Sequence, residues 1–256
     1  MKKLVYYLLV FTLTTTFLWA GFRLDDEEAF FSLWDEEIPI SDLTIQRSEE
    51  GLFFVPPESS ILKEVTEDLD PSEITHPKTV ELVEKMLDLA YGNNESREAP
   101  LYYGLAAPQI GVNKSIILVD TSIHSPADPK KKLKVFFNPK IVWQSSDYIE
   151  WTESCYSTGC ICGIVPRSQT ILVSAWNEKG EKILEEYEGY VARIFQHAID
   201  HLNGKRFPER ISNPKHLHWV EEKDFLSYQK NWKSWEKVCP PERWSYIKKY
   251  GYYHQS

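Results

Sequence analysis

The stretch FQHAIDHLNG, Phe195 to Gly204, carries the two histidines on which our interpretation of this sequence depends. His197 and His201 stand four residues apart in a segment, 189–203, whose apolar residues recur at helical spacing and which stops at Gly204. Residues four apart on a helix project from one face, so the two imidazoles lie one turn apart. This geometry can hold a divalent metal ion, and a structural pair of histidines explains the same spacing equally simply.

A third ligand decides between these interpretations. Cys155, in the segment WTESCYSTGC upstream of the helix, offers a thiolate. With two imidazoles it makes a tetrahedral site that keeps one position open for water, as catalytic zinc and iron sites do. For the other three cysteines, Cys160, Cys162 and Cys239, we expect disulfides or simple burial rather than metal binding; Cys160 and Cys162 flank a single residue and cannot easily bridge each other.

Short runs of strand-forming residues lie between this helix and a second one. The second predicted helix is amphipathic and covers residues 79–91, after Pro77. Asp-Pro, Asn-Pro and Glu-Lys-Gly turns separate the predicted strands, which are 115–119, 135–137, 141–143, 171–175 and 183–187. A helix among strands predicts an α+β fold.

The chain begins with the pattern of a secretory signal. Lys2 and Lys3 precede an apolar run that ends near Ala20 and Gly21, although Leu18 stands where a small residue is preferred. We predict a signal peptide in residues 1–22, or a membrane anchor if it is not cleaved; a buried N-terminal element is the structural alternative. The expected location is therefore outside the cytoplasm: periplasmic, secreted or membrane-anchored, with membrane contact only through an uncleaved N-terminal segment.

Composition and charge describe the rest of the chain. With 42% hydrophobic residues among 256, the chain can bury a sizeable core. The net charge of −9, without a basic patch, argues against a nucleic-acid partner. We predict an acidic extension at 23–60 and an aromatic-rich, helical extension at 212–256 that packs its tryptophans on the body of the protein.

Three separated motifs resemble those of the peptide deformylase family, in the same order and spacing. They are GLAAPQIG at Gly104–Gly111, ESCYS at Glu153–Ser157 with Pro166 and Arg167 downstream, and QHAIDHLNG at Gln196–Gly204. The resemblance covers a domain at 61–211. It implies β-sheets around a central metal-bearing α-helix, and a reaction that removes formate from the N-formylmethionine of new polypeptides.

The resemblance also implies roles for individual residues. Cys155, His197 and His201 would bind one divalent metal ion, Fe²⁺ or Zn²⁺, with nickel known in family isolates. Gln109 and the backbone N–H of Tyr156 would hold the developing oxyanion. Tyr103 and Gly104 would pair with the backbone of a peptide or small amide substrate, like an added strand. The sequence makes no prediction of oligomeric state.

One departure from the family pattern concerns the chemistry directly. The family has a Glu after the first histidine, which accepts a proton from the attacking water and delivers it to the leaving amine; here the residue is Ala198. Loss of a positioned acid-base group typically costs about 10²- to 10⁴-fold in rate. Asp200 is not a ready substitute, because it points about 200° around the helix axis from Ala198. Tyr102 and Ser154 also stand where the family has glycines.

These departures lead to three hypotheses. The first is a deformylase-like metalloprotein with strongly reduced or altered hydrolase activity, since a metal alone still polarises a carbonyl. The second is a non-catalytic module that binds blocked N-termini. The third is an ordinary deformylase with an inactivating substitution at Ala198, against which Tyr102 and Ser154 speak because they need their own explanation.

Overall fold

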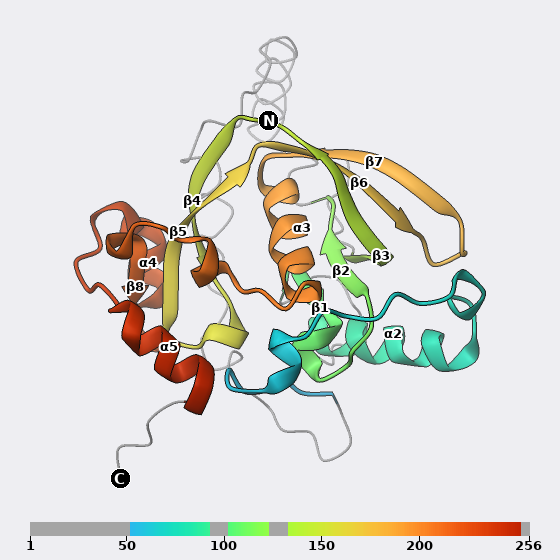
Figure 1. Ribbon diagram of the computed structural model, residues 1–256, viewed down its shortest axis with the longest axis horizontal. Helices are drawn as coiled ribbons and strands as arrows, with labels where there is room; N and C mark the ends of the chain where they lie inside the picture. Colours follow the sequence, from blue (N-terminus) through green and yellow to red (C-terminus); the bar gives the residue numbers. More distant parts are fainter. Residues whose placement is uncertain (1–51, 93–101, 123–132, 252–256) are drawn as a thin grey trace, which may run out of the picture. The chain divides into compact units, whose positions relative to one another are not determined.

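A computed structural model describes residues 52–92, 102–122 and 133–251 of the chain (Figure 1). The predicted leader at 1–22 and most of the acidic extension lie outside these residues. Among the helices of the described segments, none combines the length and the apolar character needed to span a bilayer.

Helix α3, Gly189–Leu202, lies at the centre of the described structure, with β3, β6 and β7 on one side and β4 and β5 on the other (Figure 1). The helix begins at Gly189, whose positive φ of 58° turns the chain directly out of the preceding strand. It ends before Gly204, where an added Cβ would lie 2.5 Å from the carbonyl oxygen of Lys63. This close approach requires glycine and fixes the end of the helix.

A five-stranded antiparallel sheet packs on one side of α3. Its strand order is β1-β2-β3-β6-β7. The strands are β1 Gly104–Ala106, β2 Ile116–Asp120, β3 Leu133–Gln144, β6 Thr170–Trp176 and β7 Lys182–Glu188. Phe195 and Ala192 of α3 pack against apolar residues on the inner face of the sheet, such as Phe136 and Val173.

The predicted strands 135–137 and 141–143 are one continuous strand, β3, and the turn expected between them is wrong. Asn138 adopts a positive φ of 50°, and its side chain bonds both to the N–H and to the carbonyl of Leu69, each at 2.8 Å. The pairing of β3 with β6 shifts register at this point. Asn-Pro therefore makes a bulge inside a strand, not a turn between two.

A second, three-stranded antiparallel sheet lies on the other side of α3, in the order β4-β5-β8. Its strands are β4 Tyr148–Ser154, β5 Ile161–Ser168 and β8 Leu217–Trp219. The sequence analysis did not predict this sheet, because β5 contains Gly163, Pro166 and Arg167 and so lacks the pattern of a strand. With α3 between two sheets, the predicted α+β fold around a central helix is confirmed.

The remaining helices surround this centre. Helix α2, Pro77–Ala90, covers the five-stranded sheet through Val83, Met86 and Ala90. Helices α4, Phe225–Asn231, and α5, Pro241–Tyr250, follow β8. Short 3₁₀ helices are η2 Ser60–Lys63, η3 Pro71–Glu73, η4 Ala107–Ile110, η5 Tyr156–Thr158, η6 Phe207–Arg210, η7 Pro214–His216, η8 Glu222–Asp224 and η9 Trp232–Ser234.

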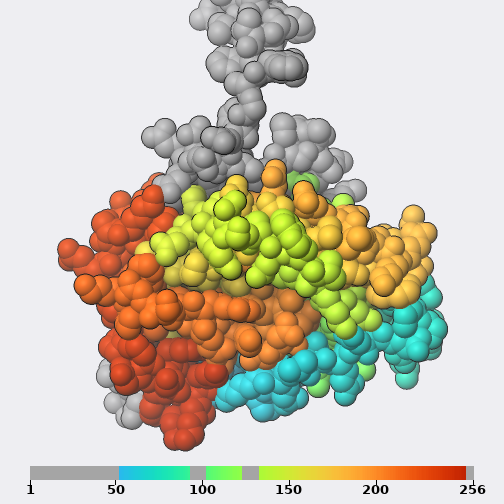
Figure 2. All heavy atoms as spheres, turned by 45° about the horizontal axis from the view of Figure 1, so that its top comes forward, coloured from blue at the N-terminus to red at the C-terminus, as the bar shows by residue number. Residues whose placement is uncertain are grey.

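The C-terminal residues pack directly on the three-stranded sheet. Trp244 and Ile247 of α5 join Val165 of β5 and Phe207 of η6 in one buried cluster. In the space-filling view, the C-terminal part (red) lies in direct contact with the segment that follows α3 (orange; Figure 2). The division of the chain at residue 211 stays a prediction.

Candidate metal centre

Three predicted ligands, distant in sequence, meet in the structure. One donor atom each from Cys155, His197 and His201 lies within 4.8 Å of the other two. Sγ of Cys155 is 3.3 Å from Nε2 of His201. The prediction that one thiolate and two imidazoles converge is therefore confirmed.

Two elements hold these ligands. Cys155 follows the last residue of β4, and the turn after it is fixed by Thr158, whose backbone N–H and hydroxyl both donate to the carbonyl of Cys155 at 2.9 and 2.8 Å. Both histidines come from one face of α3; His201 is fully buried and His197 is half-buried. Because the ligands come from packed elements, their spacing is set by the fold.

The ionisable groups of this site shift one another's pKa values. Burial raises the pKa of the Cys155 thiol, but His201 and His197 beside it hold that pKa well below its ordinary value. Burial likewise lowers the pKa of His197, and its hydrogen bonds to Cys155 and Glu153 more than reverse this, raising the pKa to about 10. Cys155 and His197 therefore stabilise each other as a thiolate and an imidazolium, and a bound metal ion would take the place of the proton on His197.

The donor set fits a divalent ion of the zinc or iron type. Metal bonds of about 2.3 Å to sulfur and about 2.1 Å to nitrogen place a tetrahedral sulfur and nitrogen about 3.6 Å apart, close to the 3.3 Å between Cys155 and His201. Thiolate and imidazole ligands also suit these metals better than magnesium or calcium. The three residues thus satisfy both the geometry and the chemistry of such a site.

Gln109 approaches the same three residues from η4. Its Oε1 accepts a hydrogen bond from the N–H of Ala106 at 2.8 Å, which leaves Nε2 to donate to Sγ of Cys155 at 3.4 Å. The side chain is buried and its orientation is fixed. The structure therefore places a buried amide donor at the metal centre, where the sequence analysis predicts it.

The other predicted site residues lie in η5 and at the start of β1. Tyr156 directly follows Cys155 in η5. Gly104 begins the edge strand β1 and lies against α3, because a Cβ at this position would be 2.6 Å from Cγ2 of Ile194. Tyr103 precedes it and contacts Tyr190 edge to face. The functional roles of these residues stay predictions.

Two features beside the ligands escaped the sequence analysis. Phe54, Tyr102 and Tyr156 form an aromatic cluster, with ring centroids 4.8 to 5.3 Å apart. Next to the metal centre, the carboxylate of Glu153 makes hydrogen bonds with the side chains of Arg167, Arg193 and His197. Arg193 shares its helix face with His197 and Asp200, and this run of polar residues on one face is a signal that could have pointed to the network.

Ala198 and Asp200 occupy different surroundings on α3. The methyl group of Ala198 is buried among apolar residues such as Ala106 and Ile117. The carboxylate of Asp200 binds Arg167 at 2.5 Å and also pairs with Arg210. Burial raises the pKa of Asp200, but Arg210 and Arg167 together hold it below its ordinary value. Asp200 is thus an ionised partner of arginines.

The cysteines outside the centre are not joined by disulfides. No disulfide links Cys160, Cys162 or Cys239 in the described structure, so the disulfide expectation is wrong and the alternative of simple burial applies to Cys162 and Cys239. Burial raises the pKa of Cys239 to about 11. Along β5, Cys162 pairs with His218 of β8.

A central helix and an adjoining strand end that together hold one thiolate and two imidazoles define an α+β metal-binding protein. The sequence matches the polypeptide deformylase family over residues 54–217, more than half of the chain. The chain belongs to this family.

Curated relatives agree with the family match. The peptide deformylase of Carboxydothermus hydrogenoformans is 39% identical over 153 residues, 60% of this chain and 88% of that protein. That of Aquifex aeolicus is 35% identical over 176 residues, 69% of this chain and 94% of that protein. The peptide deformylase of Symbiobacterium thermophilum is 37% identical over 150 residues, 56% of this chain and 65% of that protein. The chain therefore spans just under two thirds of this relative's length.

Solved structures show the same fold. The class I type b peptide deformylase from Acinetobacter baumannii, bound to Met-Ala-Ser, has a TM-score of 0.55 and 29% identity, covering 64% of this chain and 100% of that chain. The peptide deformylase from Thermotoga maritima has a TM-score of 0.54 and 27% identity, covering 64% of this chain and 99% of that chain.

Proposed function

We propose that this protein binds N-formylated peptides at an Fe²⁺ or Zn²⁺ centre and hydrolyses them with strongly reduced efficiency. The observation that carries the proposal is the convergence of Cys155, His197 and His201 next to Ala198, a residue that can neither accept nor donate a proton. The ligands of the family site are retained, while the position that the family fills with Glu offers only a methyl group.

The chain's own residues would bind and polarise the formyl group. Gln109 holds its amide Nε2 at the centre through its bond to Ala106, so it would donate to the formyl oxygen without reorganising. The backbone N–H of Tyr156 would supply the second donor. A divalent ion bound there would polarise the carbonyl and make a water more acidic.

The peptide itself would bind along β1. This strand is the edge of the five-stranded sheet, and Gly104 at its start leaves the backbone accessible for pairing. Tyr103 and Gly104 would hydrogen-bond the substrate as an added strand. The Acinetobacter baumannii relative bound to Met-Ala-Ser supports a peptide as the ligand.

What is missing is the proton transfer. Asp200 is occupied by Arg167 and Arg210 and cannot replace a base at position 198. Without a positioned base, we expect turnover about 10²- to 10⁴-fold below that of a complete site. The same observation favours a second candidate function, a module that binds blocked N-termini without hydrolysing them, because the oxyanion donor and the edge strand are retained.

A comparison of wild type with two variants distinguishes these functions. The purified protein is analysed for metal, and formate release from a formyl-Met peptide is compared among wild type, Ala198→Glu and Ala198→Gln. We expect bound metal, slow release by wild type, a rise of about 10²-fold or more in Ala198→Glu, and no rise in Ala198→Gln, which matches the added size without a base.

The remaining outcomes are equally informative. Tight peptide binding with no formate, even in Ala198→Glu, would select the binding module. Restoration of full family turnover by Ala198→Glu alone would select an ordinary deformylase with an inactivating substitution. Failure of the metal-loaded wild type to retain any divalent ion would overturn the proposal as a whole.

We further propose that the protein is exported, on the basis of Lys2, Lys3 and the apolar run after them. Cell fractionation of the full-length chain tests this. A variant with both lysines and the apolar run deleted should remain in the cytoplasm; equal distribution of the two forms would contradict export.

A further inference from the structure

A buried carboxylate next to the metal centre has all of its acceptor positions filled. Glu153, in β4, accepts two hydrogen bonds at each oxygen. Oε1 accepts from Nε of Arg167 at 2.9 Å and from Nη1 of Arg193 at 2.7 Å. Oε2 accepts from Nη2 of Arg167 at 2.9 Å and lies 2.8 Å from Nδ1 of His197. The carboxylate therefore cannot rotate without losing a bond.

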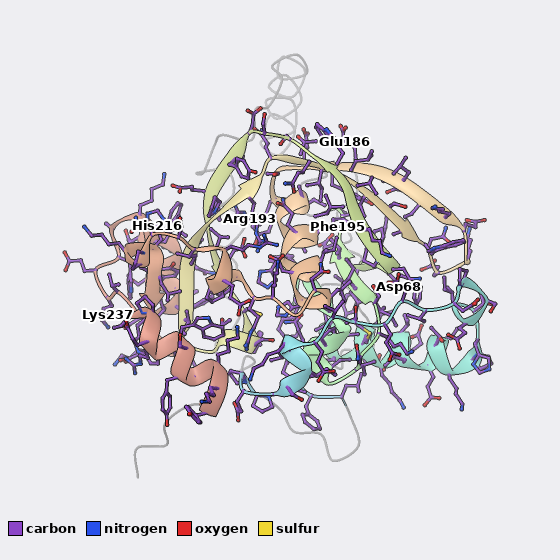
Figure 3. The ribbon with its side chains drawn as sticks, viewed as in Figure 1. Asp68, Glu186, Arg193, Phe195, His216 and Lys237 are labelled. Atoms are coloured by element: carbon purple, nitrogen blue, oxygen red, sulfur yellow. The ribbon has the colours of Figure 1, made fainter. Side chains whose placement is uncertain are left out.

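Arg193 reaches this carboxylate from α3, one turn before His197. Figure 3 shows it on the side of the helix that faces β4 and β5, while Phe195 points to the opposite side. Besides Glu153, its guanidinium donates to the backbone carbonyls of Val165 at 2.9 Å and Ile149 at 2.6 Å. The side chain is only 5% exposed. One guanidinium thus joins the metal-bearing helix to both neighbouring strands.

We infer that Arg193 is a positioning residue of the metal centre, which orients the ring of His197 through Glu153. By occupying Oε1, Arg193 leaves Oε2 as the oxygen that faces Nδ1 of His197. A hydrogen bond at Nδ1 fixes the tautomer in which Nε2 is free to bind metal, and it fixes the plane of the ring.

Stability alone is a weak reason for this arrangement. Two buried arginines share one carboxylate, and replacing buried ion pairs by well-packed apolar residues is often neutral or stabilising. Arg167 by itself already bonds both oxygens of Glu153. The second arginine therefore adds directional constraint to a carboxylate that is already neutralised, and the group that gains from this constraint is His197.

The inference rests on the metal-binding part of the proposed function and not on hydrolysis. It is tested by titrating the metal-free protein with Co²⁺, whose ligand-field absorption reports the geometry of its ligands. Wild type is compared with Arg193→Met, which retains length without donors, with Arg193→Lys, which retains one charge, and with Arg210→Met. The last variant removes a guanidinium from Asp200 in the same network without touching Glu153.

We expect Arg193→Met to bind Co²⁺ about 10- to 100-fold more weakly, as loss of a partner behind a ligand typically does, and with an altered absorption spectrum. Arg193→Lys should lie between wild type and Arg193→Met, and Arg210→Met should match wild type in both affinity and spectrum. A folded Arg193→Met with wild-type affinity and spectrum overturns the inference. Absence of Co²⁺ binding by wild type instead overturns the proposed function.

A double-mutant cycle keeps the inference testable if Arg193→Met does not fold. Arg193→Lys is combined with Glu153→Gln. If Arg193 acts through Glu153, the lysine substitution lowers Co²⁺ affinity in the wild-type background and has no further effect when Glu153 is already Gln. Equal effects in both backgrounds show that Arg193 acts by another route and contradict the inference.

Discussion

Cys155 contributes both a ligand and its charge to the metal centre. Its thiolate lies 3.3 Å from His201 and receives the amide of Gln109, so it is held in place on two sides. Serine has nearly the same shape but is a harder, far less acidic donor. Loss of a residue that only supports a ligand typically weakens metal affinity by about 10- to 100-fold. Because Cys155→Ser changes a ligand itself, we expect it to weaken Zn²⁺ affinity by more than this.

Elemental analysis after dialysis against a competing chelator measures this effect. Cys239→Ser is the matched control, because it makes the same substitution at a buried thiol that is not one of the three ligands. Equal metal retention in Cys155→Ser and wild type would mean that a different residue is the third ligand.

Asp200 makes a pH-dependent contribution to stability. Its pKa is lowered in the folded protein, because Arg210 and Arg167 outweigh the effect of burial. A carboxyl group whose pKa is lower in the folded protein stabilises the fold at pH values above its unfolded pKa of about 3.9. This contribution is lost as the pH falls through the lower pKa of the folded state. We therefore expect the free energy of unfolding to decrease steeply below about pH 4 in wild type and less steeply in Asp200→Asn.

At neutral pH the same substitution should cost about 3–5 kcal/mol, because it leaves Arg167 buried beside an uncharged amide. Urea unfolding of the metal-free protein at pH 7 and pH 3 measures both quantities. Glu81→Gln provides the comparison, since its pair with Lys85 is solvent-exposed and its loss should leave stability nearly unchanged. Parallel stability curves for Asp200→Asn and wild type would contradict the assignment.

Individual residues differ in how far the sequence predicts them. The three ligands were predictable because helical spacing puts two histidines on one face and the chemistry of metal sites asks for a third soft donor. The partners of Glu153 were not, because hydrogen bonds between β4, β5 and α3 depend on how these elements pack. Arg193 shares a helix face with His197 and Asp200, so helical periodicity identifies a polar face but not the strand residues that it contacts.

Among the elements, the helices were easier to predict than the strands. Both α2 and α3 have apolar residues at helical spacing over 14 residues, and their observed bounds differ from the predicted ones by at most two residues. Strands β4 and β5 hold the sheet next to the metal centre, yet β5 contains a proline and a buried arginine. The arginine, Arg167, is stabilised by long-range ion pairs with Glu153 and Asp200, which local patterns do not encode.

Strand β3 shows how one residue shapes an element. Asn138 combines a positive φ with two hydrogen bonds to the backbone of Leu69, and so ties the bulge of β3 to the segment before α2. Asn138→Ala loses both hydrogen bonds. It also places alanine in a left-handed backbone conformation, which asparagine tolerates better than alanine does. We expect a loss of about 2–4 kcal/mol in the free energy of unfolding.

Asn138→Gly separates the two causes, since glycine adopts a positive φ without strain but makes no side-chain bond. Chemical denaturation should place it between wild type and Asn138→Ala. If both variants are as stable as wild type, the bulge does not depend on Asn138.

At the scale of the whole described molecule, the C-terminal helices share their core with the metal-bearing part. Trp244 of α5 packs in the same buried cluster as Val165 and Phe207, and the guanidinium of Arg206 lies 4.6 Å from its ring centroid. The ring of Phe207 in turn stacks beside His197, with centroids 6.1 Å apart. This contiguous packing indicates that α5 and the metal centre unfold together.

Trp244→Ala tests that coupling. Removing a buried indole should cost about 3–5 kcal/mol, and because the cluster includes β5 and η6 the loss should appear in one cooperative transition of the whole domain. Tryptophan fluorescence and the absorbance of bound Co²⁺, followed in the same denaturant titration, should change at the same midpoint in wild type and at a lower shared midpoint in the variant. Tyr250→Ala, at an exposed position of the same helix, should leave both midpoints unchanged. If the fluorescence transition of Trp244→Ala preceded the loss of Co²⁺ absorbance, the C-terminal helices would be an independent unit, and the packing of Phe207 beside His197 would not transmit stability to the metal centre.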